Sequence, residues 1–127
     1  MRAGDETGSP DRRVLVLLAT HNGAAYLEEQ VRSILAQRDV AVRLVVSDDA
    51  STDGTGELLA AMASDPRVTL LPAGRFGTPQ ANFLRLLRDA PLDDAAAVAF
   101  ADQDDVWHLD KLARQLGLLS RLGVDAV

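Results

Sequence analysis

The sequence predicts an α/β fold, an open and mostly parallel sheet of the Rossmann-like type with helices alternating along the chain. Two observations predict this class. Short uninterrupted apolar runs recur along the chain, and such runs are typical of strands buried on both faces. The longer segments between them carry apolar residues at helical spacing. Because strands and helices alternate with short connections, we expect parallel strands joined by right-handed helical crossovers.

Four strands are expected, each from a short apolar run. They lie at residues 14–19, 42–47, 68–71 and 96–101. The first run has no polar residue, so a strand covered on both faces is predicted there. The third run is shorter, and a loop from Pro72 to Pro79 follows it.

A helix is expected after each strand, because apolar residues recur there at helical spacing. The first apolar positions of these helices are Tyr26, Leu58, Phe83 and Leu112. The apolar positions of the third helix are Phe83, Leu84, Leu86 and Leu87. Pro66 is expected to end the second helix, because the residue before a proline is disfavoured in a helix. Gly123 is expected to end the fourth.

The two ends of the chain differ from its middle. Residues 1–13 mix both charge signs and lack the apolar stretch of a signal peptide, so we expect a flexible leader. Residues 14–127 are expected to form one domain. The segment 124–127 resembles the first part of a fifth strand, so we expect a truncated domain whose sheet is incomplete at the C-terminus.

The composition excludes several classes of function. The formal net charge is −6 and no cluster of lysine or arginine is present, so nucleic-acid binding, which needs clustered cations, is not expected. The absence of cysteine rules out thiol chemistry and disulfides. No apolar run reaches the roughly 18 residues of a membrane-spanning helix, so no transmembrane segment is expected.

Unusual polar residues follow three of the predicted strands. Residues 20–22 follow the first, Asp48 and Asp49 the second, and residues 102–105 the fourth. Ligands of open parallel sheets bind beyond the carboxyl ends of the strands, so we expect these loops to share one edge and to form a site. Asn22 begins an Asn-Gly turn and is interpreted as structural.

Three carboxylates fall within residues 102–105, the sequence Asp-Gln-Asp-Asp. Neighbouring carboxylates raise each other's pKa, and a divalent cation relieves that cost. Oxygen ligands suit Mg²⁺ or Mn²⁺, which typically bridge one or two carboxylates to substrate phosphates. A solvated acidic turn is the alternative interpretation. The position directly after a buried strand favours the metal site.

The remaining candidates each have a structural and a functional interpretation. Asp48 and Asp49 either cap the following helix or provide a carboxylate that accepts a hydrogen bond from a nucleotide base. His21 either packs beside the first strand or stacks on a planar base. For Trp107 the sequence favours packing in the core or in a loop, and His108 is expected at the surface.

Four segments together resemble family 2 glycosyltransferases, which are enzymes of the GT-A type. The family motifs A-T-Y-N-G, D-D-x-S-T-D, N-F and D-x-D-D-x-W are matched at residues 19–23, 48–53, 82–83 and 102–107. His21 stands where the family usually has tyrosine. Each motif is weak alone, but four in the right order and spacing are specific. The resemblance covers residues 14–127.

The resemblance implies that these segments form the nucleotide-sugar-binding half of a GT-A-type enzyme. In the family, the residues matching Ala19 and His21 lie against the base, and the residue matching Asp49 contacts the base edge. Those matching Asp102 and Asp104 contact ribose and metal, and Asp104 is the principal ligand of the divalent cation, Mg²⁺ or Mn²⁺. The family transfers a sugar from a nucleoside diphosphate to an acceptor hydroxyl with inversion, while the cation neutralises charge on the departing diphosphate.

The form of the acidic motif and the helix sequence Asn-Phe-Leu-Arg-Leu-Leu most resemble the rhamnosyltransferase-like branch, whose members build bacterial surface polysaccharides. This resemblance implies a hexose donor linked to dTDP or UDP. It also implies an acceptor that is a glycan or a lipid-linked glycan. The expected location is the cytoplasm, either free or peripheral at the inner membrane face.

The catalytic base of the family is a carboxylate from a segment well beyond the D-x-D loop. The base is therefore expected beyond Val127, and no catalytic residue is assigned within this chain. Whether the chain itself is an enzyme stays open. The alternative is a truncated, catalytically inactive module that binds nucleotide and transfers nothing.

Two other classes are disfavoured by their missing motifs. Residues 102–106 also fit the start of haloacid-dehalogenase-like phosphatases, but the lysine and the further acidic motif of that class have no room after them. A receiver domain requires an acidic pair after the first strand. The pair in this chain follows the second strand.

Overall fold

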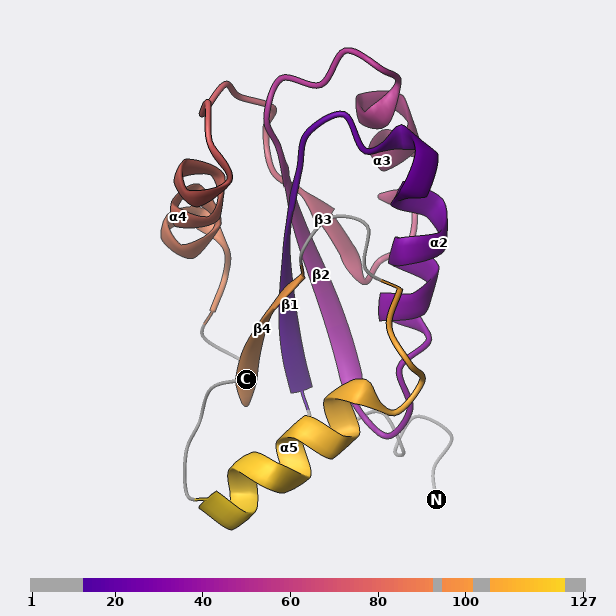
Figure 1. The fold of residues 1–127 in the computed structure, drawn as a ribbon, viewed down its shortest axis with the longest axis vertical. Coiled ribbons are helices and arrows are strands. Elements are labelled where there is room, and N and C mark those ends of the chain that lie inside the picture. Colours follow the sequence, from indigo (N-terminus) through magenta and orange to yellow (C-terminus); the bar gives the residue numbers. More distant parts are fainter. Residues whose placement is uncertain (1–12, 93–94, 102–105, 123–127) are drawn as a thin grey trace.

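The computed structural model describes residues 13–92, 95–101 and 106–122, and it confirms the predicted α/β class. These residues form a parallel sheet with helices on both faces (Figure 1). The strands are β1 (Arg13–Thr20), β2 (Ala41–Asp48), β3 (Val68–Leu70) and β4 (Ala97–Ala101). The helices are α2 (Ala24–Leu35), α3 (Thr55–Met62), α4 (Pro79–Asp89) and α5 (Lys111–Leu122).

The order of the strands in the sheet is β3-β2-β1-β4. All pairs are parallel, and Thr20 at the end of β1 pairs with Asp48 at the end of β2. On the other side of β1, Leu18 pairs with Ala101, the last residue of β4. The chain therefore runs outward from β1 to β3 and then crosses back to β4. This reversal beside β1 is where open α/β sheets bind ligands.

The central strand β1 is buried on both faces, as its uninterrupted apolar run predicts. Val14, Val16 and Leu18 of β1 belong to the core under α2, α3 and α5. Leu15 and Leu17, which alternate with them, pack with Leu86 of α4 on the opposite face. Figure 1 shows α4 alone on its side of the sheet, with α2 and α3 on the other. Each face therefore has its own apolar cluster.

Three of the apolar residues whose spacing predicted the helices are exposed. Tyr26 is 53% exposed, Leu84 65% and Leu87 41%. Helical spacing alone does not separate the last two from their buried neighbour, because α4 touches the sheet along a stripe that contains Asn82, Arg85 and Leu86. A buried asparagine and a buried arginine therefore lie on the face of α4 that meets the sheet.

The predicted leader, the acidic residues 102–105 and the predicted fifth strand lie wholly or mostly outside the described residues. Arg13, which we assigned to the leader, is the first residue of β1 and pairs with Ala41. Within the described residues, no helix is both long and apolar enough to cross a membrane.

Candidate functional site

The residues that follow β1 and β2 surround a cavity of about 650 Å³ at the carboxyl edge of the sheet. The N-terminal part of α4 and the loop before it close the other side. The lining residues are Ala19, Thr20, His21, Asp49, Ala50, Arg75, Gly77, Thr78, Pro79, Asn82 and Phe83. Three residues that the sequence singled out, Ala19, His21 and Asp49, therefore share one cavity.

The loops after β1 and β2 are joined by hydrogen bonds in both directions. The backbone N–H of Asn22 donates to Ser51 Oγ at 2.8 Å, and the backbone N–H of Thr52 donates to Asn22 Oδ1 at 2.8 Å. Asn22 has a positive φ of 51°, a conformation that asparagine tolerates better than most residues. The structure therefore supports the structural interpretation of Asn22.

Asp53 links the same two loops through the beginnings of both following helices. Its carboxylate accepts from the backbone N–H of Ala24 at 3.1 Å, and from both the N–H and the hydroxyl of Thr55. The Thr55 hydroxyl bond is the main reason why the pKa of Asp53 lies below its ordinary value. Two motifs that are distant in sequence, at residues 19–23 and 48–53, thus form one structural unit.

The carboxylate of Asp48 is used for hydrogen bonds within this unit. Its Oδ1 accepts from the hydroxyls of Thr20 at 2.7 Å and Ser51 at 2.6 Å, and its Oδ2 accepts from the backbone N–H of Ser51 at 3.2 Å. The side chain is buried, and Asp48 does not line the cavity. Of the two interpretations of Asp48, the geometry supports the structural one.

Asp49 lies at the cavity wall and binds the loop before α4. Its carboxylate accepts from the backbone N–H of Phe76 at 2.7 Å and of Gly77 at 2.9 Å. Gly77 has a φ of 89°, a left-handed conformation that favours glycine. An ionised carboxylate has about four acceptor positions, so two such bonds leave capacity for a donor from a ligand. Asp49 therefore combines a structural bond with a position suited to ligand binding.

His21 is held by the same residue. Its Nδ1 lies 2.5 Å from the carbonyl oxygen of Asp49. A carbonyl oxygen can only accept, so Nδ1 carries the proton and donates it. The amide Nδ2 of Asn22 lies 3.4 Å from the other ring nitrogen, Nε2. The imidazole plane is therefore held beside the cavity by contacts at both ring nitrogens.

The α4 side of the cavity contains residues that sequence reasoning missed. Arg75 lines the cavity from the loop, and Thr78 caps α4 by accepting the N–H of Ala81 at 3.1 Å. The signals were present, a lone cation between Gly74 and Gly77 and a threonine directly before a proline, but neither is specific without the fold.

The predicted ribose and metal ligands, Asp102 and Asp104, lie outside the described residues, so their roles stay predictions. No group of three or more potential metal ligands occurs among the side chains that the structure does describe. The two residues that follow them confirm our expectations. Trp107 is buried in the core and its backbone N–H donates to Ser33 Oγ, whereas His108 is exposed.

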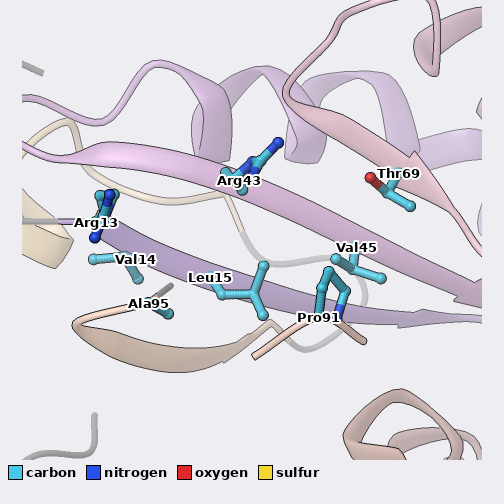
Figure 2. Close-up of a pocket in the computed structure, with 8 residues that line it drawn as sticks. All are labelled: Arg13, Val14, Leu15, Arg43, Val45, Thr69, Pro91 and Ala95. Atoms are coloured by element: carbon cyan, nitrogen blue, oxygen red, sulfur yellow. The ribbon is translucent and has the colours of Figure 1, made fainter. Parts of the chain in front are cut away.

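A second cavity, of about 210 Å³, lies toward the amino ends of the strands on the α4 face (Figure 2). Leu15 and Val45 line it from the sheet, and the cations Arg13 and Arg43 line it from the same two strands. None of the residues in the four sequence motifs lines this cavity. The motifs at residues 19–23, 48–53 and 82–83 instead all contribute to the lining of the larger cavity at the carboxyl edge.

Comparison with known sequences identifies relatives of one kind. The family model of glycosyl transferase family 2 matches residues 15–127. The dTDP-rhamnosyl transferase RfbG of Shigella flexneri is 36% identical over 105 residues, which cover 80% of this chain and 36% of that protein. The putative teichuronic acid biosynthesis glycosyltransferase TuaG of Bacillus subtilis is 32% identical, over 81% of this chain and 40% of its own. The chain thus spans little more than a third of these relatives.

Solved structures agree with this result. The mannosyltransferase PcManGT from Pyrobaculum calidifontis, solved in complex with GDP-Man and Mn²⁺, superposes with a TM-score of 0.73 at 30% identity. The match covers 91% of this chain and 35% of that one. S. aureus TarS in complex with UDP has a TM-score of 0.64 at 23% identity, over 86% and 32% of the two chains, and shows likeness of fold alone.

Proposed function

Because the chain belongs to glycosyl transferase family 2 and has the GT-A fold, we propose that its cavity at the carboxyl edge of the sheet binds the nucleoside diphosphate of a sugar donor. The donor in this proposal is a hexose linked to dTDP or UDP. The hexose is transferred with inversion to an acceptor hydroxyl of a glycan or lipid-linked glycan. One observation carries the proposal: Asp49 and His21 meet at the wall of this cavity.

The chemistry of Asp49 supports recognition of the base. An ionised carboxylate only accepts hydrogen bonds, so it favours bases that present a ring N–H, as thymine, uracil and guanine do but adenine and cytosine do not. Two backbone N–H groups hold the carboxylate in place before any ligand arrives. The imidazole of His21 provides a plane against which a base stacks, and the small side chain of Ala19 leaves room beside it.

A divalent cation is part of the proposal. Asp104 would be its principal ligand, with Asp102 at the ribose, and a carboxylate fits this role because carboxylate oxygens are what Mg²⁺ and Mn²⁺ prefer. When bound, the cation would neutralise negative charge on the diphosphate. The relative solved with GDP-Man contains Mn²⁺.

The relatives support a role in polysaccharide synthesis. One is named for teichuronic acid biosynthesis, and a third relative, from Rhizobium meliloti and 35% identical over 81% of this chain, is a succinoglycan biosynthesis protein. The chain covers 28% of that protein's length. We propose a bacterial surface polysaccharide as the product, made at the cytoplasmic side of the membrane where nucleotide sugars are available.

A second candidate is a nucleotide-binding module without transfer activity. One observation favours it: among the described residues that line the cavity, Asp49 is the sole carboxylate, and its oxygens already bind the 76–77 backbone. Of the residues described at the cavity wall, no carboxylate other than Asp49 is therefore present to act as the base, which the family takes from a carboxylate. Hydrolysis or transfer of dTDP- or UDP-hexose by the protein would exclude this alternative.

Calorimetric titration tests the proposal. The protein is titrated with dTDP, UDP, GDP and ADP, with and without Mn²⁺, alongside Asp49→Asn and Asp104→Asn. Asp110→Asn is a matched control, because Asp110 is an exposed residue paired with Arg114 on α5, outside the cavity. We expect metal-dependent binding of dTDP or UDP, weakened in the first two variants and unchanged in the control. A folded protein that binds none of the four nucleotides would overturn the proposal.

A further inference from the structure

Arg85 is a buried cation on α4, only 9% exposed, and it does not line the cavity. A guanidinium is rarely buried without several partners, because losing its hydration is costly. Arg85 has three. Nη1 donates to Ser47 Oγ at 3.0 Å, Nη2 to the carbonyl oxygen of Pro72 at 2.8 Å, and Nε to Asp89 Oδ2 at 3.0 Å. One side chain therefore joins β2, α4 and the loop before α4.

Asp89 keeps the buried charge paired. The pKa of Asp89 is lowered to about 2, mainly by its hydrogen bond with Arg88 and further by that with Arg85. Asp89 is therefore ionised at neutral pH. The side chain of Arg88 is 71% exposed, so this neighbour holds Asp89 from the solvent side.

Ser47 and Asn82 extend the contacts of Arg85 toward the cavity. The Ser47 hydroxyl donates to Asn82 Oδ1 at 2.5 Å, and Asn82 Nδ2 donates to the carbonyl oxygens of Ser47 at 3.0 Å and Thr20 at 3.4 Å. Asn82 itself lines the cavity. We call Ser47, Asn82 and Arg85 the α4 network. It joins the ends of β1 and β2 to α4 with directional bonds.

The loop between β3 and α4 is held by Arg85 at two places. One is the carbonyl oxygen of Pro72. The other is the ring of Phe76, whose centroid lies 5.1 Å from the guanidinium carbon, a distance at which cation and aromatic face attract. The ring also lies against Gly74, since a Cβ there would be 2.6 Å from Cζ of Phe76. Arg85 thus fixes the path of the backbone that carries the N–H groups bound by Asp49.

We propose that Arg85 is a positioning residue for the nucleotide site, which fixes the loop from Pro72 to Gly77 and through it the orientation of the Asp49 carboxylate and the place of Arg75. It does so without touching the nucleotide. This inference rests on the proposed function. It predicts that changes at Arg85 alter both the affinity for a nucleoside diphosphate and the preference between bases.

The chemistry of the side chain specifies arginine at this position. A guanidinium is a planar fork that donates in several directions and stacks on a ring, whereas an ammonium is a compact point charge. A lysine here keeps the charge near Asp89 but does not span Ser47, Pro72 and Phe76 at once. Arg85→Lys therefore separates positioning from charge.

The first measurement uses the protein without nucleotide. Amide hydrogen exchange of Phe76 and Gly77 is followed by NMR in the unmodified protein, Arg85→Lys and the control Arg88→Lys, which changes an exposed arginine with the same partner, Asp89. Both amides are expected to exchange roughly tenfold faster in Arg85→Lys, the effect of losing about one charged hydrogen bond. Amides in the middle of β1 and β2 keep their protection, and the control behaves as the unmodified protein.

The second measurement is the affinity of the same three proteins for dTDP, UDP and GDP. We expect Kd to rise roughly tenfold in Arg85→Lys and the ratio of Kd values between GDP and dTDP to change, with no change in Arg88→Lys. Phe76→Leu keeps Arg85 and removes the ring, so it provides a second route to the same effect. The combination Arg85→Lys with Phe76→Leu should be little worse than either alone, because both act through one loop.

The outcomes separate the two claims. If the unmodified protein binds nucleotide, and Arg85→Lys and Phe76→Leu keep its Kd and base preference, Arg85 only supports the fold and the inference is overturned, whatever the exchange rates. Unchanged exchange at Phe76 and Gly77 in Arg85→Lys also overturns it. If the unmodified protein binds no nucleoside diphosphate, the proposed function fails and the inference fails with it.

Discussion

The two faces of the sheet are covered in different ways. On one face α2, α3 and α5 pack mainly through aliphatic side chains such as Ile34, Leu59 and Leu112, all fully buried. On the other face α4 is alone, and its buried stripe includes Asn82 and Arg85. Apolar burial is non-directional and stabilises the fold as a whole, whereas hydrogen bonds to buried polar groups fix particular atoms. The cavity lies beside the α4 face, where hydrogen-bonded Asn82 and Arg85 take part in joining the helix to the sheet.

A core substitution on the three-helix face should have the largest effect on stability. Leu44 of β2 is fully buried there, so Leu44→Ala should lower the free energy of unfolding by about 2–5 kcal/mol. Urea unfolding followed by circular dichroism measures it. The folded fraction should bind nucleotide with unchanged Kd, because this face does not line the cavity. A fall in the affinity of the folded fraction would show that the three-helix face also affects the nucleotide site, contrary to this comparison.

A substitution in the α4 network should affect both stability and binding. Asn82→Ala leaves buried groups of Ser47 and the carbonyl oxygen of Thr20 with fewer partners, so we expect a loss of about 1–3 kcal/mol of stability together with weaker nucleotide binding. The exposed Gln80→Ala on the same helix is the control. If Asn82→Ala lowers stability alone, the α4 network does not hold the site.

The cap of α4 should give a smaller effect of the same kind. Thr78→Ala removes the oxygen that accepts the N–H of Ala81, which should cost about 1 kcal/mol. Thr69→Ala, in the middle of β3 and exposed, is the comparison variant. Thermal unfolding of the two variants is sufficient. Equal melting temperatures for both would show that the cap contributes little.

The smallest effect is expected at the turn between α3 and β3, away from the cavity. Hydrogen bonds from Arg67 lower the pKa of Asp65 from 3.8 to about 2. A carboxyl group with a lowered folded pKa adds stability that is present above 3.8 and is lost as pH falls toward about 2. In Asp65→Asn the free energy of unfolding should therefore fall less steeply with decreasing pH in this window than it does in the unmodified protein. The free energy of unfolding is measured as a function of pH for both proteins. Parallel curves would contradict the prediction.

Sequence reasoning reached the fold and part of the site. Uninterrupted apolar runs predict buried parallel strands, and the polar residues that follow them predict which edge carries the site, as the shared cavity of Ala19, His21 and Asp49 shows. Burial of Arg85 was not predictable, because a charged residue of an amphipathic helix typically lies on the exposed face. Only the tertiary contacts with Ser47 and Pro72 reveal why it is buried.

The residue types alone left the roles of Asp48 and Asp49 open, and only the family resemblance singled out Asp49. Adjacent residues of a strand point to opposite faces. Asp48 therefore binds Thr20 and Ser51, while Asp49 reaches the loop before α4. Which carboxylate belongs to which face depends on the register of β1 and β2, and that register is a property of the folded sheet.

The most direct test of the central claim is to map nucleotide binding onto the two cavities of the α4 face. The ¹⁵N-labelled protein is titrated with dTDP or UDP in the presence of Mg²⁺, and amide chemical shifts are followed by NMR. We predict saturable shifts at Ala19, His21, Phe76 and Gly77, with none at Arg43 or Thr69 beside the second cavity (Figure 2). Shifts confined to Arg43, Thr69 and their neighbours, or no saturable shift at all, would contradict the assignment of the nucleotide site to the carboxyl edge of the sheet.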